Sequence, residues 1–160
     1  MEYKKDLDIA VAQRKSSKKL VQKLKNISEK DLDKQFLRLH NEAFEEIDCL
    51  SCANCCKTTS PIFRDIDIKR LSKVLKCSSS QFVEKYLILD DENDYVLESS
   101  PCPFLLENNK CSVYEDRPLA CREYPHTNRK KMHQILSLTR KNTEVCPAVS
   151  RIFVQLKKEF

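Results

Sequence analysis

The chain has 160 residues and a net charge of +5, from 29 lysines and arginines against 24 aspartates and glutamates. A chain of this length buries enough surface to fold around one core without covalent crosslinks. It contains no glycine, which excludes the phosphate-binding loop, the GxGxxG turn of dinucleotide-binding folds and the GxSxG nucleophile elbow.

The longest apolar runs are too short for a membrane helix or a signal peptide. They cover four residues each, at 9–12 and 86–89, whereas a membrane helix needs ~20 and a signal-peptide core ~7–15. We therefore expect a cytoplasmic protein with no membrane segment. The nine cysteines would stay reduced there, and closely spaced cysteines in that compartment are typical of metal ligands or redox centres.

The positive charge is concentrated at the N-terminus, where residues 1–30 carry nine basic and four acidic side chains. Apolar residues near helical spacing predict a basic helix here, interrupted by the polar run 14–19. We therefore divide the chain into a basic helical segment, 1–27, and a cysteine-cluster metal-binding domain, 28–160. A solvated amphipathic helix is the simpler interpretation of this segment, and an acidic protein is the partner that its charge would suit. Nucleic acid is not favoured, because only Tyr3 supplies an aromatic ring for base stacking.

A second helix is predicted to begin after Ser28. Ser28 and Asp31 match an N-cap followed by an acidic residue three positions on, and apolar residues then repeat at helical spacing. These residues are Leu32, Phe36, Leu39, Ala43 and Ile47. The cysteine cluster begins at the end of this helix, with Cys49, and is expected to continue as a loop.

The rest of the chain predicts short elements joined by turns. They are a helix capped by Asp65, a helix capped within 78–80 that carries Phe82, Tyr86 and Leu89, a turn at 90–94, a short strand at 95–97, a hairpin turn at Asn108 and Asn109, a short helix from Pro118 through Cys121, and a final helix from Pro147. The predicted fold is mainly α, a small irregular domain stabilised by metal, with cysteine-rich loops and at most a short hairpin. Without glycine, left-handed backbone positions should fall to asparagine. The candidates are Asn54, Asn93, Asn108, Asn109 and Asn142.

Four cysteines in eight positions form the motif CxxCxxCC, at 49–56. CxxC spacing allows two thiolates to converge on one metal ion. The odd cysteine count and the expected compartment argue against disulfides. Side chains of neighbouring residues point to opposite sides of an extended segment, so the pair Cys55 and Cys56 favours more than one metal atom. The lone Cys77 is interpreted as a half-buried apolar filler.

The cysteine-rich blocks resemble a known family. The blocks are CLSCANCC (49–56), PCPFLLENNKCSVYEDRPLACREYP (101–125) and the pair Cys146-Pro147. They occur in the order found in the CxxCxxCC family of zinc- or iron-chelating proteins, and the resemblance spans roughly 49–150. It implies eight metal ligands, Cys49, Cys52, Cys55, Cys56, Cys102, Cys111, Cys121 and Cys146, in two centres or one multinuclear cluster. It supplies no settled biochemical role.

Zinc is favoured over iron as the metal, because zinc readily forms closed structural sites with four thiolates and no flavin, nucleotide or radical motif accompanies the cysteines. An iron–sulfur cluster remains the alternative, since Cys49, Cys52 and Cys55 match the start of a bacterial ferredoxin run, which Cys56 then breaks. A closed zinc site predicts a structural or partner-binding protein more than an enzyme. The iron–sulfur alternative predicts a redox or enzymatic protein.

Overall fold

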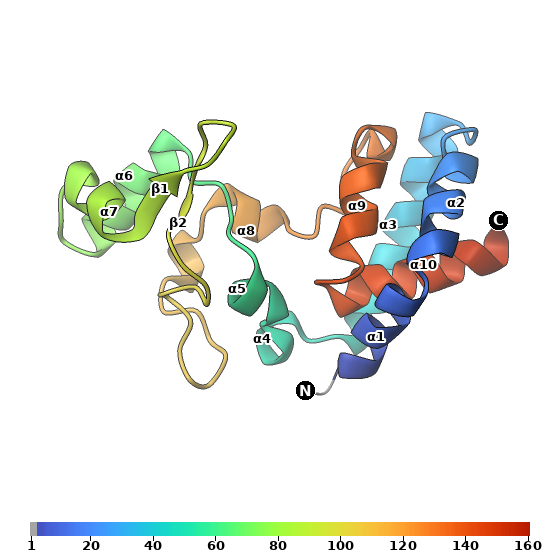
Figure 1. The fold of residues 1–160 in the computed structure, drawn as a ribbon, viewed down its shortest axis with the longest axis horizontal. Helices are drawn as coiled ribbons and strands as arrows, with labels where there is room; N and C mark the ends of the chain where they lie inside the picture. The colour runs from blue at the N-terminus through green and yellow to red at the C-terminus, as the bar shows by residue number, and fades with distance from the viewer. Residues whose placement is uncertain (1–2) are drawn as a thin grey trace. The chain divides into compact units, whose positions relative to one another are not determined.

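The computed structural model describes residues 3–160. The chain forms two compact units, which we call unit 1 (Met1–Cys52 with Pro125–Phe160) and unit 2 (Ala53–Tyr124). The mainly α prediction is confirmed: the ordered elements of both units are helices, apart from one two-stranded hairpin in unit 2 (Figure 1). Within the described residues, no helix is both long and apolar enough to cross a membrane.

Unit 1 is built from helices of both chain ends. They are α1 (Lys4–Ala12), α2 (Arg14–Leu24), α3 (Glu29–Glu46), α4 (Cys49–Cys52), the 3-10 helix η2 (Met132–Ile135), α9 (Leu136–Asn142) and α10 (Pro147–Glu159). Helix α10 packs against α1, α3 and α9, and α2 packs against α9. The largest fully buried side chains include Phe36 of α3 and Phe153 of α10, so the C-terminal helix fills the centre of this unit.

The helix predicted after Ser28 is confirmed as α3. The Ser28 hydroxyl accepts a hydrogen bond from the Asp31 backbone N–H at 3.2 Å. Its predicted apolar face is buried, with Leu32 and Phe36 fully enclosed. The basic N-terminal helix forms in two pieces, because α1 ends at Ala12 and α2 begins at Arg14. The interruption falls at the start of the polar run 14–19.

Unit 2 contains the remaining elements. They are α5 (Asn54–Thr58), α6 (Asp65–Val74), α7 (Ser79–Tyr86), strands β1 (Leu87–Leu89) and β2 (Tyr95–Leu97), the 3-10 helix η1 (Tyr114–Asp116) and α8 (Leu119–Glu123). The strands pair antiparallel, with Leu87 opposite Leu97. Ser78 caps α7 as predicted, accepting from the Gln81 backbone N–H at 3.1 Å.

The core of unit 2 is a cluster of aromatic and aliphatic side chains around Phe82, which is fully buried. The Phe82 ring lies 6.0 Å from that of Phe63 and 6.2 Å from that of Phe104, between ring centroids. Tyr86 packs beside both Phe82 and Phe104. This core therefore joins α7 to the segments that carry the later cysteines.

Four local predictions were wrong. Asp65 does not cap α6, because Arg64 is the N-cap and Asp65 is the first residue of the helix. The CxxCxxCC motif is not a loop, because it forms the short helices α4 and α5. The helix that contains Phe82 ends at Tyr86, so Leu89 lies on strand β1 instead. Among the described residues, the asparagines with positive φ are Asn93 and Asn109, and the other left-handed positions are Ala53, Lys76, His126 and Lys131. The remaining candidates Asn54, Asn108 and Asn142 are therefore not left-handed.

Candidate metal centre

The first four cysteines lie on two short helices that meet at Ala53. Cys49 and Cys52 begin and end α4, and the Cys52 backbone N–H donates to the Asp48 carbonyl at 3.1 Å. Ala53 has φ 47° and ψ 17°, in the left-handed region. This turn separates α4 from α5 and directs Cys55 and Cys56 into unit 2.

The sequence predicts that Cys55 and Cys56 point to opposite sides of an extended segment, and this prediction was wrong. Both lie on α5, where successive side chains are about 100° apart around the helix axis. A hydrogen bond from Cys55 lowers the pKa of the Cys56 thiol to about 7, in opposition to burial. The two sulfurs are thus neighbours. Because they do not point to opposite sides of the chain, the pair no longer indicates that more than one metal atom is bound.

The next two cysteines are positioned by backbone hydrogen bonds. The Cys102 N–H donates to the Cys56 carbonyl at 2.8 Å, which joins the 101–105 segment to α5. A tight turn at 106–110 then reverses the chain, and Leu105 forms a β-bridge with Cys111. The predicted hairpin turn is confirmed, with the left-handed residue at Asn109. Cys102 and Cys111 are half-buried and pack against the core of unit 2.

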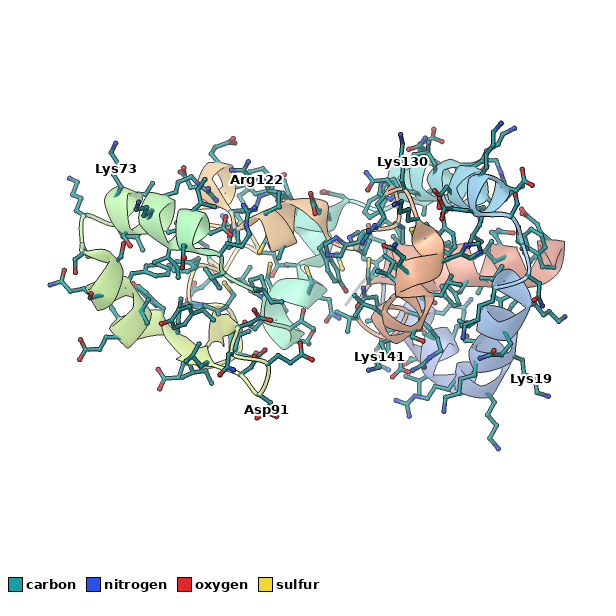
Figure 2. The ribbon with its side chains drawn as sticks, turned by 90° about the horizontal axis from the view of Figure 1, so that it is seen from above. Lys19, Lys73, Asp91, Arg122, Lys130 and Lys141 are labelled. Atoms are coloured by element: carbon teal, nitrogen blue, oxygen red, sulfur yellow. The ribbon has the colours of Figure 1, made fainter. Side chains whose placement is uncertain are left out.

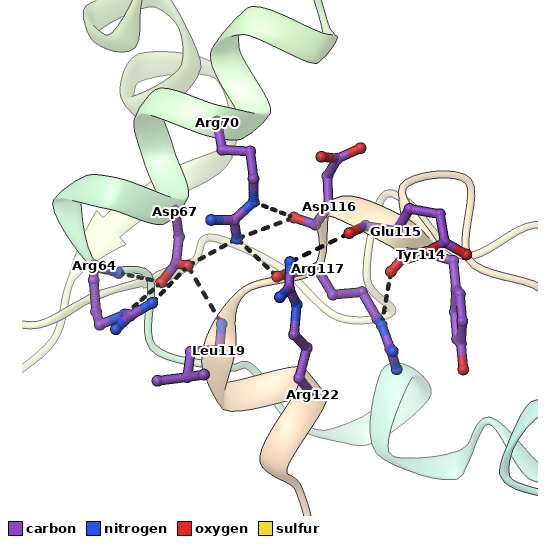
Figure 3. A network of polar contacts seen from close by, with 9 residues as sticks. All are labelled: Arg64, Asp67, Arg70, Tyr114, Glu115, Asp116, Arg117, Leu119 and Arg122. Atoms are coloured by element: carbon purple, nitrogen blue, oxygen red, sulfur yellow. Dashed lines mark hydrogen bonds and ion pairs between the residues drawn. The ribbon is translucent and has the colours of Figure 1, made fainter.

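Cys121 is positioned by a polar network around a buried carboxylate (Figure 3). Asp67 is fully buried and forms ion pairs with Arg64 at 3.0 Å and Arg70 at 2.9 Å. It also accepts the Leu119 backbone N–H, at 3.3 Å, two residues before Cys121. Burial raises the pKa of Asp67, but the hydrogen bonds outweigh burial and lower it to about 2.

The same network holds the chain just before α8. The Arg70 guanidinium donates to the backbone carbonyls of Asp116 and Arg117, the latter at 2.8 Å (Figure 3). Asp67 and Arg70 therefore bind the backbone on both sides of Pro118, the residue just before the first residue of α8. Sequence analysis missed this network. The signal available was the spacing of Arg64, Asp67 and Arg70, three residues apart at the start of a helix.

The sulfurs of unit 2 interact electrostatically with one another. Burial, together with the charges of Cys56, Cys102 and Cys111, raises the pKa of Cys121 to about 12. Burial likewise raises the pKa values of Cys102 and Cys111, with smaller contributions from Cys56. The four sulfurs are therefore close enough to affect one another's ionisation.

Cys146 belongs to unit 1, immediately before α10. It is buried, and its backbone N–H donates to the Asn142 carbonyl at 2.8 Å. Burial raises its pKa to about 12, with smaller contributions to that shift from the charges of Cys49 and Cys52. Cys49, the exposed member of this group, and the buried Cys52 are thus electrostatic neighbours of Cys146 within unit 1.

The ninth cysteine and the two arginines near Cys121 have other surroundings. Cys77 packs against the apolar core of unit 2.

Arg117 donates to the Tyr114 carbonyl at 2.8 Å, and its guanidinium lies 3.7 Å from the centre of the Tyr114 ring. Its charge lowers the pKa values of Cys56, Cys111 and Cys121. Arg122 instead donates to the Glu115 carbonyl.

The cysteine sulfurs are the donor type that zinc and iron prefer, but the structure does not hold them in a complete coordination geometry. Thiolate sulfur is the preferred protein ligand of structural zinc and of iron–sulfur clusters, and the nearby Arg117 charge favours thiolates in unit 2. Among residues 3–160, no group of three or more His, Cys, Asp or Glu side chains is arranged so that it could hold a metal ion. Binding would therefore require the thiols to lose protons and move together, which couples binding to local folding.

Comparison with known protein families agrees with these residues. The family model described as "CxxCxxCC: Putative zinc- or iron-chelating domain" matches residues 48–147. The chain belongs to the CxxCxxCC family. The match begins just before α4 and ends at the first residue of α10, so it contains all eight candidate cysteines. Neither the curated proteins nor the solved structures gave a match.

Membership supports metal binding as the general role of the chain, with zinc or iron as the metal. The CxxCxxCC match leaves α1, α2 and α3 outside, so it assigns no role to the basic N-terminal helices. The sequence expectation of an acidic partner for those helices has to be argued from their own surface.

Proposed function

We propose that this CxxCxxCC protein is a cytoplasmic metal-binding protein that holds zinc through cysteine thiolates in a structural or partner-binding role. The proposed ligands are Cys49, Cys52, Cys55, Cys56, Cys102, Cys111, Cys121 and Cys146. The observation that supports the proposal is that Cys56, Cys102, Cys111 and Cys121, from four separate parts of unit 2, lie close enough for their charges to affect one another. Buried thiolates that lie near one another repel, and this arrangement becomes favourable when a bound cation neutralises their charge.

A structural role follows from the number of thiolates. A zinc ion with four protein ligands has no open position for substrate or water. Metal bound in this way would instead fix the short helices and turns that carry the cysteines.

Anaerobic purification followed by metal analysis tests the proposal. We expect a colourless protein that contains zinc. A brown protein with broad visible absorption and bound iron would replace zinc with an iron–sulfur cluster and favour the redox role. Protein that is folded, reduced and free of both metals after growth in zinc- and iron-supplemented medium would refute metal binding.

A basic surface of unit 1 supports an acidic partner as a second function. A cavity of about 280 Å³ is lined by Arg14 and Lys18 of α2, by Arg140 and Lys141 of α9, and by Glu144. Arg14 pairs with Glu144 through two hydrogen bonds, at 2.8 and 2.6 Å. The other three cations leave an excess of positive charge, and Lys141 projects at the surface of this unit (Figure 2). We propose that this cavity binds carboxylate side chains of a partner.

Binding of a fluorescent oligoglutamate peptide tests this surface. The double variant Lys18→Glu, Lys141→Glu should weaken binding by tenfold or more, because it reverses two charges at the cavity. The double variant Lys69→Glu, Lys73→Glu is the matched control, since both are exposed lysines of α6 in unit 2 and the charge changes by the same amount (Lys73 is labelled in Figure 2). Equal weakening by both variants at matched total charge would indicate only a general charge effect and would contradict a specific surface.

A further inference from the structure

The two units divide the eight proposed ligands unequally. Cys49, Cys52 and Cys146 lie in unit 1, and the others lie in unit 2. Given that the protein binds metal, as proposed above, we propose that Cys56, Cys102, Cys111 and Cys121 form one four-sulfur metal centre complete within unit 2. The cysteines of unit 1 contribute no ligand to it.

Backbone geometry brings the first three of these cysteines together. The 2.8 Å hydrogen bond from the Cys102 N–H to the Cys56 carbonyl places the two residues on directly bonded segments. The bridge between Leu105 and Cys111, with the 2.8 Å bond from Ser112 N–H to the Phe104 carbonyl, returns the chain alongside Cys102. The three side chains thus come from α5 and from the two arms of the hairpin that packs on it.

Cys121 joins this group through the Asp67 network. Asp67 accepts from Leu119, and Arg70 donates to the carbonyls of Asp116 and Arg117. Both contacts fix the start of α8 against α6, and Cys121 is the third residue of that helix. Among the causes of the raised pKa of Cys121, the charges of Cys56, Cys102 and Cys111 follow burial. The electrostatic neighbours are therefore the same residues that the backbone brings together.

Four thiolates satisfy both candidate metals. Structural zinc takes four thiolates in tetrahedral geometry, and iron–sulfur clusters are commonly held by four cysteines. Cys55 is adjacent to this set, and its hydrogen bond is directed to Cys56. We therefore leave Cys55 out of this four-sulfur set. The group on unit 1, around Cys146, has its own electrostatic neighbours in Cys49 and Cys52.

Substitutions in the full-length protein test the assignment by metal-to-protein ratio. Cys111→Ser and Cys121→Ser should each lower the ratio by about one zinc ion per chain, because each opens the same four-ligand site. The double variant should lose no more than either single variant, since both residues serve one site. Cys77→Ser is the matched control within unit 2 and should retain all of the metal. Cys146→Ser should retain the metal of the unit 2 centre.

Two results would overturn the four-sulfur centre. One is loss of all metal from Cys146→Ser and from Cys111→Ser alike, which would indicate one multinuclear cluster. The other is loss of metal from Cys77→Ser equal to that of Cys111→Ser. If the unsubstituted protein itself contains no metal, the proposed function fails before the assignment is tested, so the two failures are distinguishable.

Alkylation of the unsubstituted, metal-loaded protein gives a second measurement that does not depend on variants folding. As chelator is added, Cys56, Cys102, Cys111 and Cys121 should become reactive together. Mass spectrometry identifies the labelled residues. Simultaneous labelling of all eight candidate cysteines, or labelling of Cys121 well before Cys56, would contradict one shared centre.

Discussion

Asp67 shows how a single buried carboxylate can determine the position of a distant ligand. Its side chain is fully enclosed, yet it is ionised because Arg64, Arg70 and the Leu119 backbone N–H bind its oxygens. A buried charge is tolerated only when its hydrogen-bonding capacity is satisfied in this way. Asp67 acts through α8, so it is a positioning residue for Cys121.

We predict that Asp67→Asn destabilises the protein at pH 7 by about 2 kcal/mol, the usual range for losing hydrogen bonds to a charged group. Denaturant unfolding of the metal-loaded protein measures the change. Asp65→Asn is the control on the same helix, because Asp65 is an exposed first-turn residue. Asp65→Asn should lower the free energy of unfolding by about 0.3–1 kcal/mol, because it removes only a favourable interaction with the helix dipole.

The effect of Asp67 should depend on pH in a defined direction. Its pKa is about 2 in the folded protein and ~3.9 in an unfolded chain. The stabilisation is therefore complete above pH ~4 and is lost as the pH falls towards 2. The difference between the original protein and Asp67→Asn should narrow from pH 5 to pH 3. A difference that stays constant over this range would show that the ionised carboxylate is not its source.

At the scale of elements, Ala53 separates the two helices of the CxxCxxCC motif. Its φ of 47° lies where a residue with a Cβ is disfavoured, by roughly 1–2 kcal/mol. Ala53→Gly should therefore stabilise the protein by about 0.5–1 kcal/mol, the steric relief being partly offset by glycine's freedom in the unfolded chain. Metal content should not change. Thermal unfolding and metal analysis measure the two quantities.

The same substitution in a helix should have the opposite sign. Ala43 lies within α3 and is buried, so Ala43→Gly should destabilise by about 1 kcal/mol through lower helix propensity. If Ala53→Gly also destabilises by that amount, the left-handed turn between α4 and α5 is not the conformation of the protein in solution.

Elements with strong local signals could be predicted from sequence. Helix α3 has a cap and an apolar repeat, and α10 begins with Pro147 and carries its buried face at helical spacing. Helices α4 and α5 could not be predicted, because four or five residues contain too little periodicity. Their residues were identified as ligand candidates from cysteine spacing, but the side-by-side arrangement of Cys55 and Cys56 depends on the backbone.

At the scale of the whole molecule, neither the end of the basic segment nor the start of the cysteine motif coincides with a boundary between the two packed units. The basic segment 1–27 packs within unit 1, where Leu20, Val21 and Leu24 are buried. Arg151 of α10 forms an ion pair with Asp6 at 3.0 Å. Contacts between chain ends depend on tertiary structure, so neither the charge distribution nor the cysteine motif could reveal them.

Metal removal should therefore affect the two units unequally. Unit 1 has a helical core in which Phe36, Ile152 and Leu156 are buried without any need for metal. The segments of unit 2 near the proposed centre are short, and metal binding is coupled to their folding. We predict that a strong chelator accelerates amide hydrogen exchange in 102–121 by roughly tenfold or more, a loss of about 1.4 kcal/mol of local stability.

The amides of α3 and α10 provide the internal comparison in the same experiment, and their exchange should change little on chelation. Hydrogen exchange followed by mass spectrometry resolves these peptides, and metal analysis confirms that the chelated sample is empty. Equal acceleration in α3, α10 and 102–121 would mean that the metal stabilises the whole chain. The backbone N–H groups of Cys102 and Ser112 are hydrogen-bonded within the 102–121 region. If the metal orders this region, its removal must expose these N–H groups to exchange. Unchanged exchange rates in all peptides would therefore contradict a structural role for the metal.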